Sequence, residues 1–304
     1  MLQVCYVVVS KGWDRHSQMA WVSAQSVRRQ EPAARIVMVV DGDPEAEREM
    51  SRRFADVADA VIPKRSTETT AVAKSRHHKI ALREYLSGDF LYLDSDTLAV
   101  APFADVLKAA GEVGAVADFN FDINRGWFPK DVEAPFRALG WDYPLPYQVN
   151  AGVIFMRDTP AVHETSREWL RRFRASTALP HVWDQATFNS ALFATKVPHV
   201  VLPHAYNAQV VKRNYRFRDA KILHFYGSVD EQRGTIMEHL LNHLQSTGAF
   251  DDEAYGLSIR QRHPWAPQPE AWQLLHSRNY VRAMIQKARQ TARMLGGAGG
   301  SANE

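Results

Sequence analysis

The sequence predicts an α/β protein in which a Rossmann-like mixed central sheet is flanked by helices and followed by a helical C-terminal extension. Short apolar runs alternate with longer amphipathic stretches, which is typical of strands that feed helices in such a sheet. The chain has 304 residues, of which 45% are hydrophobic, so it can bury a large core. Its last stretch is basic and amphipathic, which indicates a helical extension.

The alternation assigns each element in turn. In the first half we expect strands at residues 3–10, 35–40, 60–63 and 90–93, and helices at 16–30, 44–54 and 70–87. In the second half we expect strands at 113–117, 149–156 and 221–225, and helices at 161–175, 184–193 and 276–295. The segment 120–147 is rich in aromatic residues and proline and has no clear period, so we expect a long functional loop.

We expect a catalytic domain over residues 1–254, a basic helical extension over 255–295 and a disordered tail over 296–304. The net charge is +3, and the positive charge is concentrated in the extension, so the body of the protein is close to neutral. This distribution argues against a broad nucleic-acid-binding face.

The chain contains a single cysteine, Cys5. One thiol excludes both an intramolecular disulfide framework and a cysteine-rich zinc site, and it suits a reducing compartment. The sequence shows no signal peptide and no apolar run of membrane-spanning length, so we expect a cytoplasmic protein.

Two Asp-x-Asp motifs follow apolar runs, at Asp41-Gly42-Asp43 and at Asp94-Ser95-Asp96. Two carboxylates spaced in this way at a strand end can converge on one hard cation. The first motif continues into Pro44-Glu45, which is typical of a helix N-cap, a proline at the first helical position and an acidic first turn. We therefore interpret the first motif as structural.

The second motif follows the entirely apolar run 90–93, which predicts a central strand whose end meets a ligand crevice. The residues after it resume apolar character instead of starting a capped helix. A buried acidic pair without a cation would be unfavourable because of desolvation and mutual repulsion. We therefore predict that Asp94 and Asp96 bind Mn²⁺ or Mg²⁺. A phosphatase of the haloacid dehalogenase type is disfavoured, because Thr97 stands one place earlier than the threonine of that motif.

Over residues 3–230 the chain resembles the GT-A-fold glycosyltransferases, most closely family 8, which includes glycogenin and the lipopolysaccharide galactosyltransferases. The similarity rests on four blocks in order, which are residues 79–97 with the metal motif, 148–156 with Asn-Ala-Gly, 183–189 with Asp-Gln, and 221–227 with a histidine. The resemblance implies a GT-A-type sheet, a nucleotide-diphosphate sugar donor, with UDP-sugars favoured, and transfer to a saccharide or other hydroxyl acceptor with retention.

The resemblance also implies roles for single residues. His224 would complete the metal site with the two aspartates, a ligand set that suits Mn²⁺. Lys79, Asn150 and Gly227 would contact the donor, and Asp184 and Gln185 would lie near its anomeric carbon. Residues Trp13 and Asp14, in the loop after the first strand, are assigned to the nucleotide base, where the ring would stack and the carboxylate would accept a hydrogen bond. Asp184 is also a candidate helix N-cap.

The chain departs from the family at two places. Ala186 stands where the family often has a second aspartate, and residues 228–233 replace the usual Lys-Pro-Trp, with Arg233 as the nearest cation. These departures indicate a divergent member. They also keep open a nucleotide-sugar-binding protein without catalysis. A nucleotidyltransferase that acts on sugar phosphates is the other alternative, since such enzymes share nucleotide-binding α/β sheets and acidic metal sites, but it is disfavoured because residues 9–13 contain a single glycine.

Two further segments admit two interpretations each. The aromatic residues of the irregular segment would form either an acceptor-sugar site or a satellite hydrophobic cluster, and they are Trp127, Phe128, Trp141, Tyr143 and Tyr147. The basic helix at 276–295 would lie either on an anionic membrane, as a peripheral contact at its inner face, or against the body of the protein.

Overall fold

The computed structural model describes residues 1–118, 133–142, 145–177, 184–210, 217–226, 233–265, 267–276 and 280–297. The chain forms two compact units. Unit 1 comprises residues 1–209 and 220–224, and unit 2 comprises 210–219 and 225–304. The expected catalytic domain over residues 1–254 and basic extension over 255–295 remain predictions.

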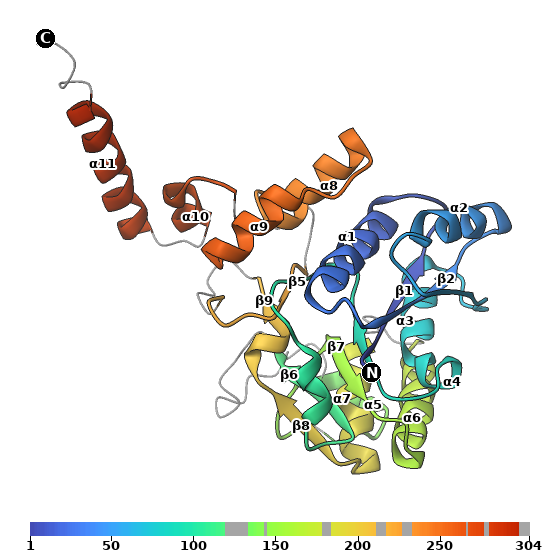
Figure 1. Ribbon diagram of the computed structural model, residues 1–304. Helices are drawn as coiled ribbons and strands as arrows, with labels where there is room; N and C mark the ends of the chain where they lie inside the picture. Colours follow the sequence, from blue (N-terminus) through green and yellow to red (C-terminus); the bar gives the residue numbers. More distant parts are fainter. Residues whose placement is uncertain are drawn as a thin grey trace, which may run out of the picture. The chain divides into compact units, whose positions relative to one another are not determined.

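Unit 1 is built on a seven-stranded mixed sheet with the order β3-β2-β1-β4-β7-β6-β8 (Figure 1). The strands are β1 (Gln3–Val9), β2 (Arg35–Asp41), β3 (Ala60–Pro63), β4 (Phe90–Leu93), β6 (Val113–Ala117), β7 (Val149–Met156) and β8 (His199–Leu202). β1 pairs in parallel with both β2 and β4, and β7 runs antiparallel to both β4 and β6. The predicted mixed α/β sheet is therefore confirmed.

Helices cover both faces of this sheet. They are α1 (Arg15–Gln30), α2 (Pro44–Phe54), α3 (Ala71–Ile80), α4 (Leu82–Tyr85), α5 (Glu133–Ala138), α6 (Pro160–Ser176) and α7 (Asp184–Thr195). Alternate residues of β1 point to opposite faces. Cys5 and Val7 join a buried cluster with Trp169 of α6 and Phe188 of α7, whereas the Tyr6 hydroxyl lies 2.9 Å from Ser23 Oγ on α1.

The helix expected over 70–87 is broken at Ala81, which ends α3 with φ −82° and ψ 1°. The core explains the break. Ile80 and Leu82 lie in the same buried cluster, although two residues at this spacing in a continuous helix would point about 200° apart. The segment expected to be irregular also contains a helical turn, because α5 lies within it.

A second, three-stranded sheet has the order β5-β10-β9 and contains β5 (Thr97–Ala99), β9 (Ala208–Gln209) and β10 (Ile222–His224). β5 begins directly after the second Asp-x-Asp motif and pairs antiparallel with β10, so that Thr97 stands opposite His224. Two 3-10 helices accompany these strands, at Ala104–Lys108 and His204–Asn207.

Unit 2 contains the helices α8 (Ile236–Thr247), α9 (Asp252–Gln261), α10 (Glu270–His276) and α11 (Tyr280–Gly297). α11 confirms the expected C-terminal helix and extends to Gly297, two residues into the expected tail, whose residues 298–304 lie outside the described part of the chain. Within the described residues, no helix combines the length and the apolar character that a membrane crossing requires.

Candidate metal and donor site

The candidate site lies where the strand order of the large sheet reverses. β1 lies between β2 and β4, so successive connections leave it in opposite directions and a crevice opens at the carboxyl ends of β1 and β4. Asp94 directly follows β4. A pocket of about 270 Å³ opens there and is lined by Val7, Val8, Val9, His16, Ala71, Val72, Ser75, Arg76, Lys79, Tyr92, Asp94, Ser95 and Asp184.

Asp94, Asp96 and His224 form a cluster beside this crevice, as the sequence predicts. One ligand atom from each lies within 4.8 Å of the others. The Nε2 atom of His224 is 3.2 Å from Oδ1 of Asp96 and 3.8 Å from Oδ2 of Asp94. Two carboxylates and an imidazole are a donor set that fits a hard divalent cation, and Mn²⁺ in particular.

The orientation of the His224 ring favours metal binding. Its Nδ1 atom lies 3.0 Å from Oδ1 of Asn207, an oxygen that only accepts, so Nδ1 carries the hydrogen and the Nε2 lone pair faces the carboxylates. Asn207 in turn donates to Oδ1 of Asn150 at 2.9 Å, and Asn150 donates to Asp118 at 3.2 Å. This buried amide chain fixes the imidazole. Asn150, which the resemblance assigns to the donor, thus also supports the metal cluster.

Burial disfavours the charged form of His224, but the carboxylates of Asp96 and Asp94 outweigh it and raise the pKa of the imidazole. Burial likewise opposes ionisation of Asp96, and His224 beside it lowers the pKa of that carboxyl. A proton and a cation would therefore compete for the Nε2 lone pair of His224.

Lys79 lies between the metal cluster and the expected catalytic pair. Its Nζ atom is 3.2 Å from Oδ1 of Asp94 and 2.9 Å from Oδ2 of Asp184, and the side chain is only 7% exposed. Burial disfavours the ammonium ion, but Asp184 and Asp94 outweigh burial and raise the pKa of Lys79. The hydroxyl of Tyr92 donates to Asp94 from the same side.

Asp184 is the first residue of α7, at the mouth of that helix. Burial would raise the pKa of its carboxyl, but Lys79 and Arg76 outweigh burial and lower it. Asp184 is therefore a carboxylate near neutral pH. Gln185 beside it accepts a hydrogen bond from the backbone N–H of Ala151 at 3.1 Å, which ties α7 to β7.

Arg76 is a site residue that the sequence did not reveal. It lines the pocket, and its Nε atom lies 3.4 Å from Oδ1 of Asp184. The sequence could have indicated Arg76 as a neighbour of Lys79, because the two residues are three positions apart in α3 and residues at this spacing share a helix face. Two cations thus flank the carboxylate of Asp184.

The first Asp-x-Asp motif is structural, as predicted. Asp43 caps α2, accepting from the N–H groups of Glu45 and Ala46. Asp41 is buried and accepts from the N–H of Ser66 at 3.0 Å, and it lies 2.8 Å from Nε2 of His78. It is held by α3 and the segment after β3, and it is not among the residues of the metal cluster.

The expected contacts to the nucleotide base remain predictions. The Asp14 carboxylate caps α1 by accepting from the N–H groups of His16 and Ser17, and Trp13 packs edge-on against Phe54 with the guanidinium of Arg53 over its ring. Neither Trp13 nor Asp14 lines the described pocket, whereas His16 does. Gly227, also assigned to the donor, lies outside the described residues.

The aromatic residues expected at an acceptor site are only partly described. Trp141 packs against Phe136 with ring centroids 5.4 Å apart, and the guanidinium of Arg172 covers its ring. The Tyr147 hydroxyl lies 2.6 Å from Nε2 of His199. Trp141 therefore belongs to a satellite cluster with Phe136 and Leu145, whereas Tyr147 packs against the main core. Trp127, Phe128 and Tyr143 lie outside the described residues.

The fold is that of the GT-A glycosyltransferases. The galactosyltransferase LgtC, solved with donor and acceptor sugar analogues, superposes with a TM-score of 0.52 at 14% identity and covers 84% of this chain and 99% of its own. Mouse xyloside xylosyltransferase 1 superposes with a TM-score of 0.50 at 13% identity, covering 75% of this chain and 98% of its own. The glycosyltransferase GlyE of Streptococcus pneumoniae TIGR4 superposes with a TM-score of 0.53 at 12% identity, and the match covers 86% of this chain and 63% of GlyE.

Identities of this size establish the fold alone. No protein-family model and no curated protein sequence matches the chain.

Proposed function

We propose that the protein is a metal-dependent glycosyltransferase that moves a sugar from a nucleotide-diphosphate sugar, a UDP-sugar in first place, to a saccharide or other hydroxyl acceptor with retention of configuration. The observation that carries this proposal is the convergence of Asp94, Asp96 and His224 beside the Lys79–Asp184 ion pair. A candidate cation cluster and a buried ammonium beside the same crevice of a GT-A fold support the proposal.

Asp94, Asp96 and His224 would hold the Mn²⁺ or Mg²⁺ ion. When bound, the cation would neutralise the donor diphosphate and polarise the leaving group. The Lys79 ammonium, which is fixed between two carboxylates, would add positive charge where negative charge grows on the leaving oxygen. Gly227 and Asn150 would complete the donor contacts.

Asp184 and Gln185 would act at the anomeric carbon. Because Lys79 and Arg76 lower the pKa of Asp184, this carboxyl is ionised and does not serve as a proton donor. A fixed carboxylate there would stabilise the positive charge of an oxocarbenium-like transition state. The amide of Gln185, tied to β7, would hold its orientation beside it.

The C-terminal helices support a peripheral contact with the cytoplasmic face of an anionic membrane. Large apolar side chains of α10 and α11 are exposed to solvent, namely Trp272, Tyr280, Val281, Met284 and Ile285. Arg282, Lys287 and Arg289 on α11 are exposed as well. Apolar side chains beside cationic ones are typical of helices that lie in a bilayer interface. This combination of side chains is the basis on which we propose the membrane contact.

The central test is the release of UDP, GDP or CMP from UDP-, GDP- and CMP-sugars, measured with and without Mn²⁺. We expect metal-dependent turnover with UDP-sugars. Asp96→Ala should lower it about a hundredfold or more, because a bound metal contributes several kcal/mol to such a step. The anomeric configuration of the product, read by NMR, tests retention.

Asp43→Ala is the matched control, because it removes the equivalent aspartate from the first Asp-x-Asp motif. Full metal-dependent turnover in Asp96→Ala would overturn the metal assignment. Donor binding by thermal shift without any turnover in the wild-type protein would instead support a non-catalytic nucleotide-sugar-binding protein.

A further inference from the structure

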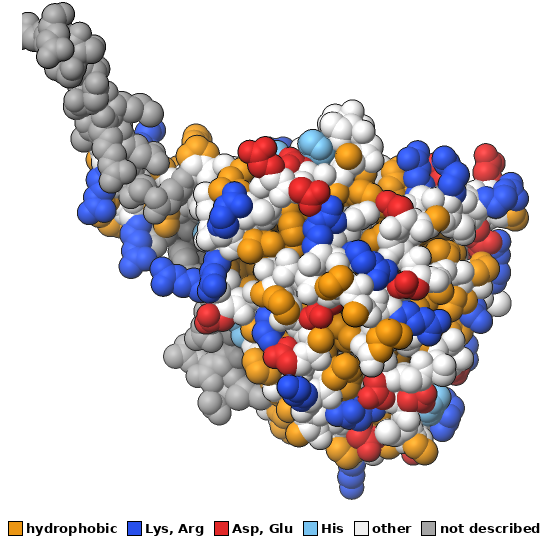
Figure 2. Space-filling model, in the orientation of Figure 1, with side chains coloured by type: hydrophobic (Ala, Val, Ile, Leu, Met, Phe, Trp, Pro, Cys, Tyr) orange, Lys and Arg blue, Asp and Glu red, His pale blue; other side chains and the backbone are white. Residues whose placement is uncertain are grey.

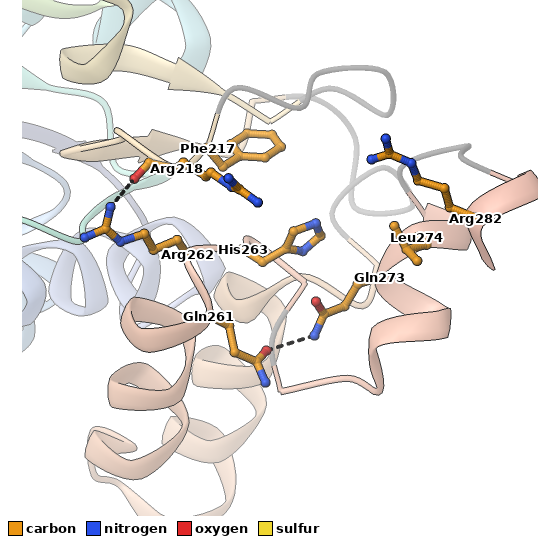
Figure 3. Close-up of a pocket in the computed structure, with 8 residues that line it drawn as sticks. All are labelled: Phe217, Arg218, Gln261, Arg262, His263, Gln273, Leu274 and Arg282. Carbon is orange, nitrogen blue, oxygen red and sulfur yellow. Dashed lines mark hydrogen bonds between the residues drawn. The ribbon is translucent and has the colours of Figure 1, made fainter. Parts of the chain in front are cut away.

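Unit 2 contains a cavity of its own, which the proposed glycosyl transfer does not use. The cavity has a volume of about 450 Å³ and is lined by Phe217, Arg218, Gln261, Arg262, His263, Gln273, Leu274 and Arg282 (Figure 3). Its residues come from three segments: the turn at 217–219, the C-terminal end of α9, and the pair α10–α11. We call it the arginine pocket.

One side of the arginine pocket is a rigid aromatic wall. Phe217 is buried and packs edge-on against His263 and Trp265, with ring centroids 6.2 and 5.9 Å apart. The centroids of His263 and Trp265 are 5.1 Å apart. Arg262 stabilises the same wall, because its Nη1 atom donates to the carbonyl of Arg218 at 3.1 Å and its guanidinium points away from the cavity.

His263 and Gln273 contribute polar groups to the lining of the cavity. Nδ1 of His263 accepts from the N–H of Trp265 at 3.4 Å, so the hydrogen of the neutral ring is on Nε2. Burial lowers the pKa of His263 to about 4, which keeps the ring neutral at physiological pH. The buried Gln273 donates to Oε1 of Gln261 at 2.9 Å and to the carbonyl of Gln268 at 2.5 Å, which fixes its amide in the lining.

The charge of the pocket is entirely positive in the part of the chain that the structure describes. Arg218 reaches into the cavity from the aromatic wall, and Arg282 approaches from α11 on the opposite side (Figure 3). No carboxylate stands among the described residues that line it. Two guanidinium groups and an imidazole N–H around one cavity suit a group with several anionic oxygens, which is the chemistry of a phosphate ester.

The surroundings indicate that this phosphate ester carries a lipid tail. Leu274 and Arg282 line the pocket from α10 and α11, the same helices that expose Trp272, Val281 and Ile285. Figure 2 shows basic side chains gathered along the edge of this unit. A ligand with an anionic head and an apolar tail would satisfy the pocket and the exposed apolar side chains together.

We propose that the arginine pocket binds the phosphate headgroup of an anionic membrane lipid, with Arg218 and Arg282 as its principal ligands. The proposal deepens the proposed membrane contact, since it changes a general attraction to anionic surfaces into recognition of one headgroup. It does not depend on glycosyl transfer.

The test measures binding of the full chain to three kinds of vesicle: phosphatidylcholine alone, phosphatidylcholine with phosphatidic acid, and phosphatidylcholine with oleic acid at matched surface charge. Oleate supplies negative charge without a phosphate. We expect the wild-type protein to bind phosphatidic acid vesicles about tenfold or more tightly than oleate vesicles, because charge-assisted bonds to phosphate add to the surface attraction.

Arg218→Gln and Arg282→Gln should abolish this preference for phosphatidic acid. Arg289→Gln is the matched control, because it removes the same charge from α11 at a residue that does not line the pocket. The control should weaken binding to both anionic vesicles by about fivefold and leave the preference intact. Circular dichroism and metal-dependent donor hydrolysis report whether each variant is folded.

Two outcomes overturn the proposal. One outcome is that the wild-type protein shows no preference for phosphatidic acid vesicles over oleate vesicles, or that both pocket variants keep this preference. The other is binding of soluble glycerol 3-phosphate to the pocket as tightly as the vesicles, which would identify a soluble phosphate ester as the ligand. A protein that shows the lipid preference but no donor hydrolysis would overturn the proposed glycosyl transfer alone.

Discussion

The backbone N–H of Asp94 donates to the carbonyl of Gly152 at 2.8 Å, so the metal motif on β4 lies directly against the Asn-Ala-Gly strand β7. This contact leaves no room for a side chain at residue 152. A Cβ there would overlap Cε1 of His224 and would lie 2.8 Å from Oδ2 of Asp94. The glycine therefore makes space for the metal cluster as well as for any ligand that approaches the backbone.

Gly152→Ala should separate the metal ligands. The added methyl group must displace His224 or Asp94, so we expect the affinity for Mn²⁺ to fall about tenfold or more and the stability to fall by about 1–3 kcal/mol. Titration calorimetry with Mn²⁺ measures the first effect. Gly256→Ala in α9 is the control, since the new methyl would meet only the mobile end of Arg260, at 3.3 Å. Equal metal affinity in the two variants would contradict the described cluster.

Lys79→Gln should damage both chemistry and stability. The variant leaves Asp94 and Asp184 without their shared ammonium, so we expect donor turnover to fall about a hundredfold and stability by about 3 kcal/mol. Lys74→Gln makes the same chemical change on the same helix, at a lysine that is 30% exposed and pairs with Asp41. It should leave turnover close to that of the wild type. Turnover and denaturant unfolding are measured on both proteins, and a normal rate in Lys79→Gln would remove this lysine from the proposed mechanism.

Asp43→Ala should affect folding and not catalysis. The substitution removes the two hydrogen bonds that cap α2, which is expected to lower the free energy of unfolding by a small, measurable amount. Metal-dependent turnover and Mn²⁺ affinity should not change. Urea denaturation and the turnover assay provide the two readings. A loss of metal affinity in this variant would show that both Asp-x-Asp motifs take part in metal binding.

The stability of unit 2 should depend on pH through His263. Its ordinary pKa of 6.5 applies in the unfolded chain, whereas burial lowers the pKa in the folded protein to about 4. Between these values the unfolded state binds the proton and the folded state does not, so stability is full above pH 6.5 and falls as the pH drops towards 4. The loss amounts to at most about 3 kcal/mol.

NMR titration of the His263 ring measures the pKa directly, and denaturant unfolding followed across this pH range measures the stability. In His263→Phe the part of the pH dependence that comes from this residue should disappear. A ring that titrates near 6.5 in the folded wild-type protein would contradict the expected burial effect.

Much of the fold follows from local patterns in the sequence. The strands at 90–93, 113–117 and 149–156 have the bounds that their apolar runs predict, because nearly continuous burial on both faces leaves a recognisable signal. The capping role of Asp43 was also readable, since an N-cap involves only neighbours in the chain. The break of the helix at Ala81 was not readable, because it serves to bury Ile80 and Leu82 in one core.

The same distinction between local sequence patterns and tertiary packing applies to the candidate site. The sequence by itself determined that Asp94 and Asp96 stand together at a strand end, and the resemblance added His224 and Lys79 as candidates. Only the tertiary structure decided that antiparallel pairing of β5 with β10 brings His224 beside Asp96, and that Arg76 joins Lys79 around Asp184. The physical reason is that a helix or strand period records which face of an element is buried. The partner across that face is selected by chain topology, which local periods do not record.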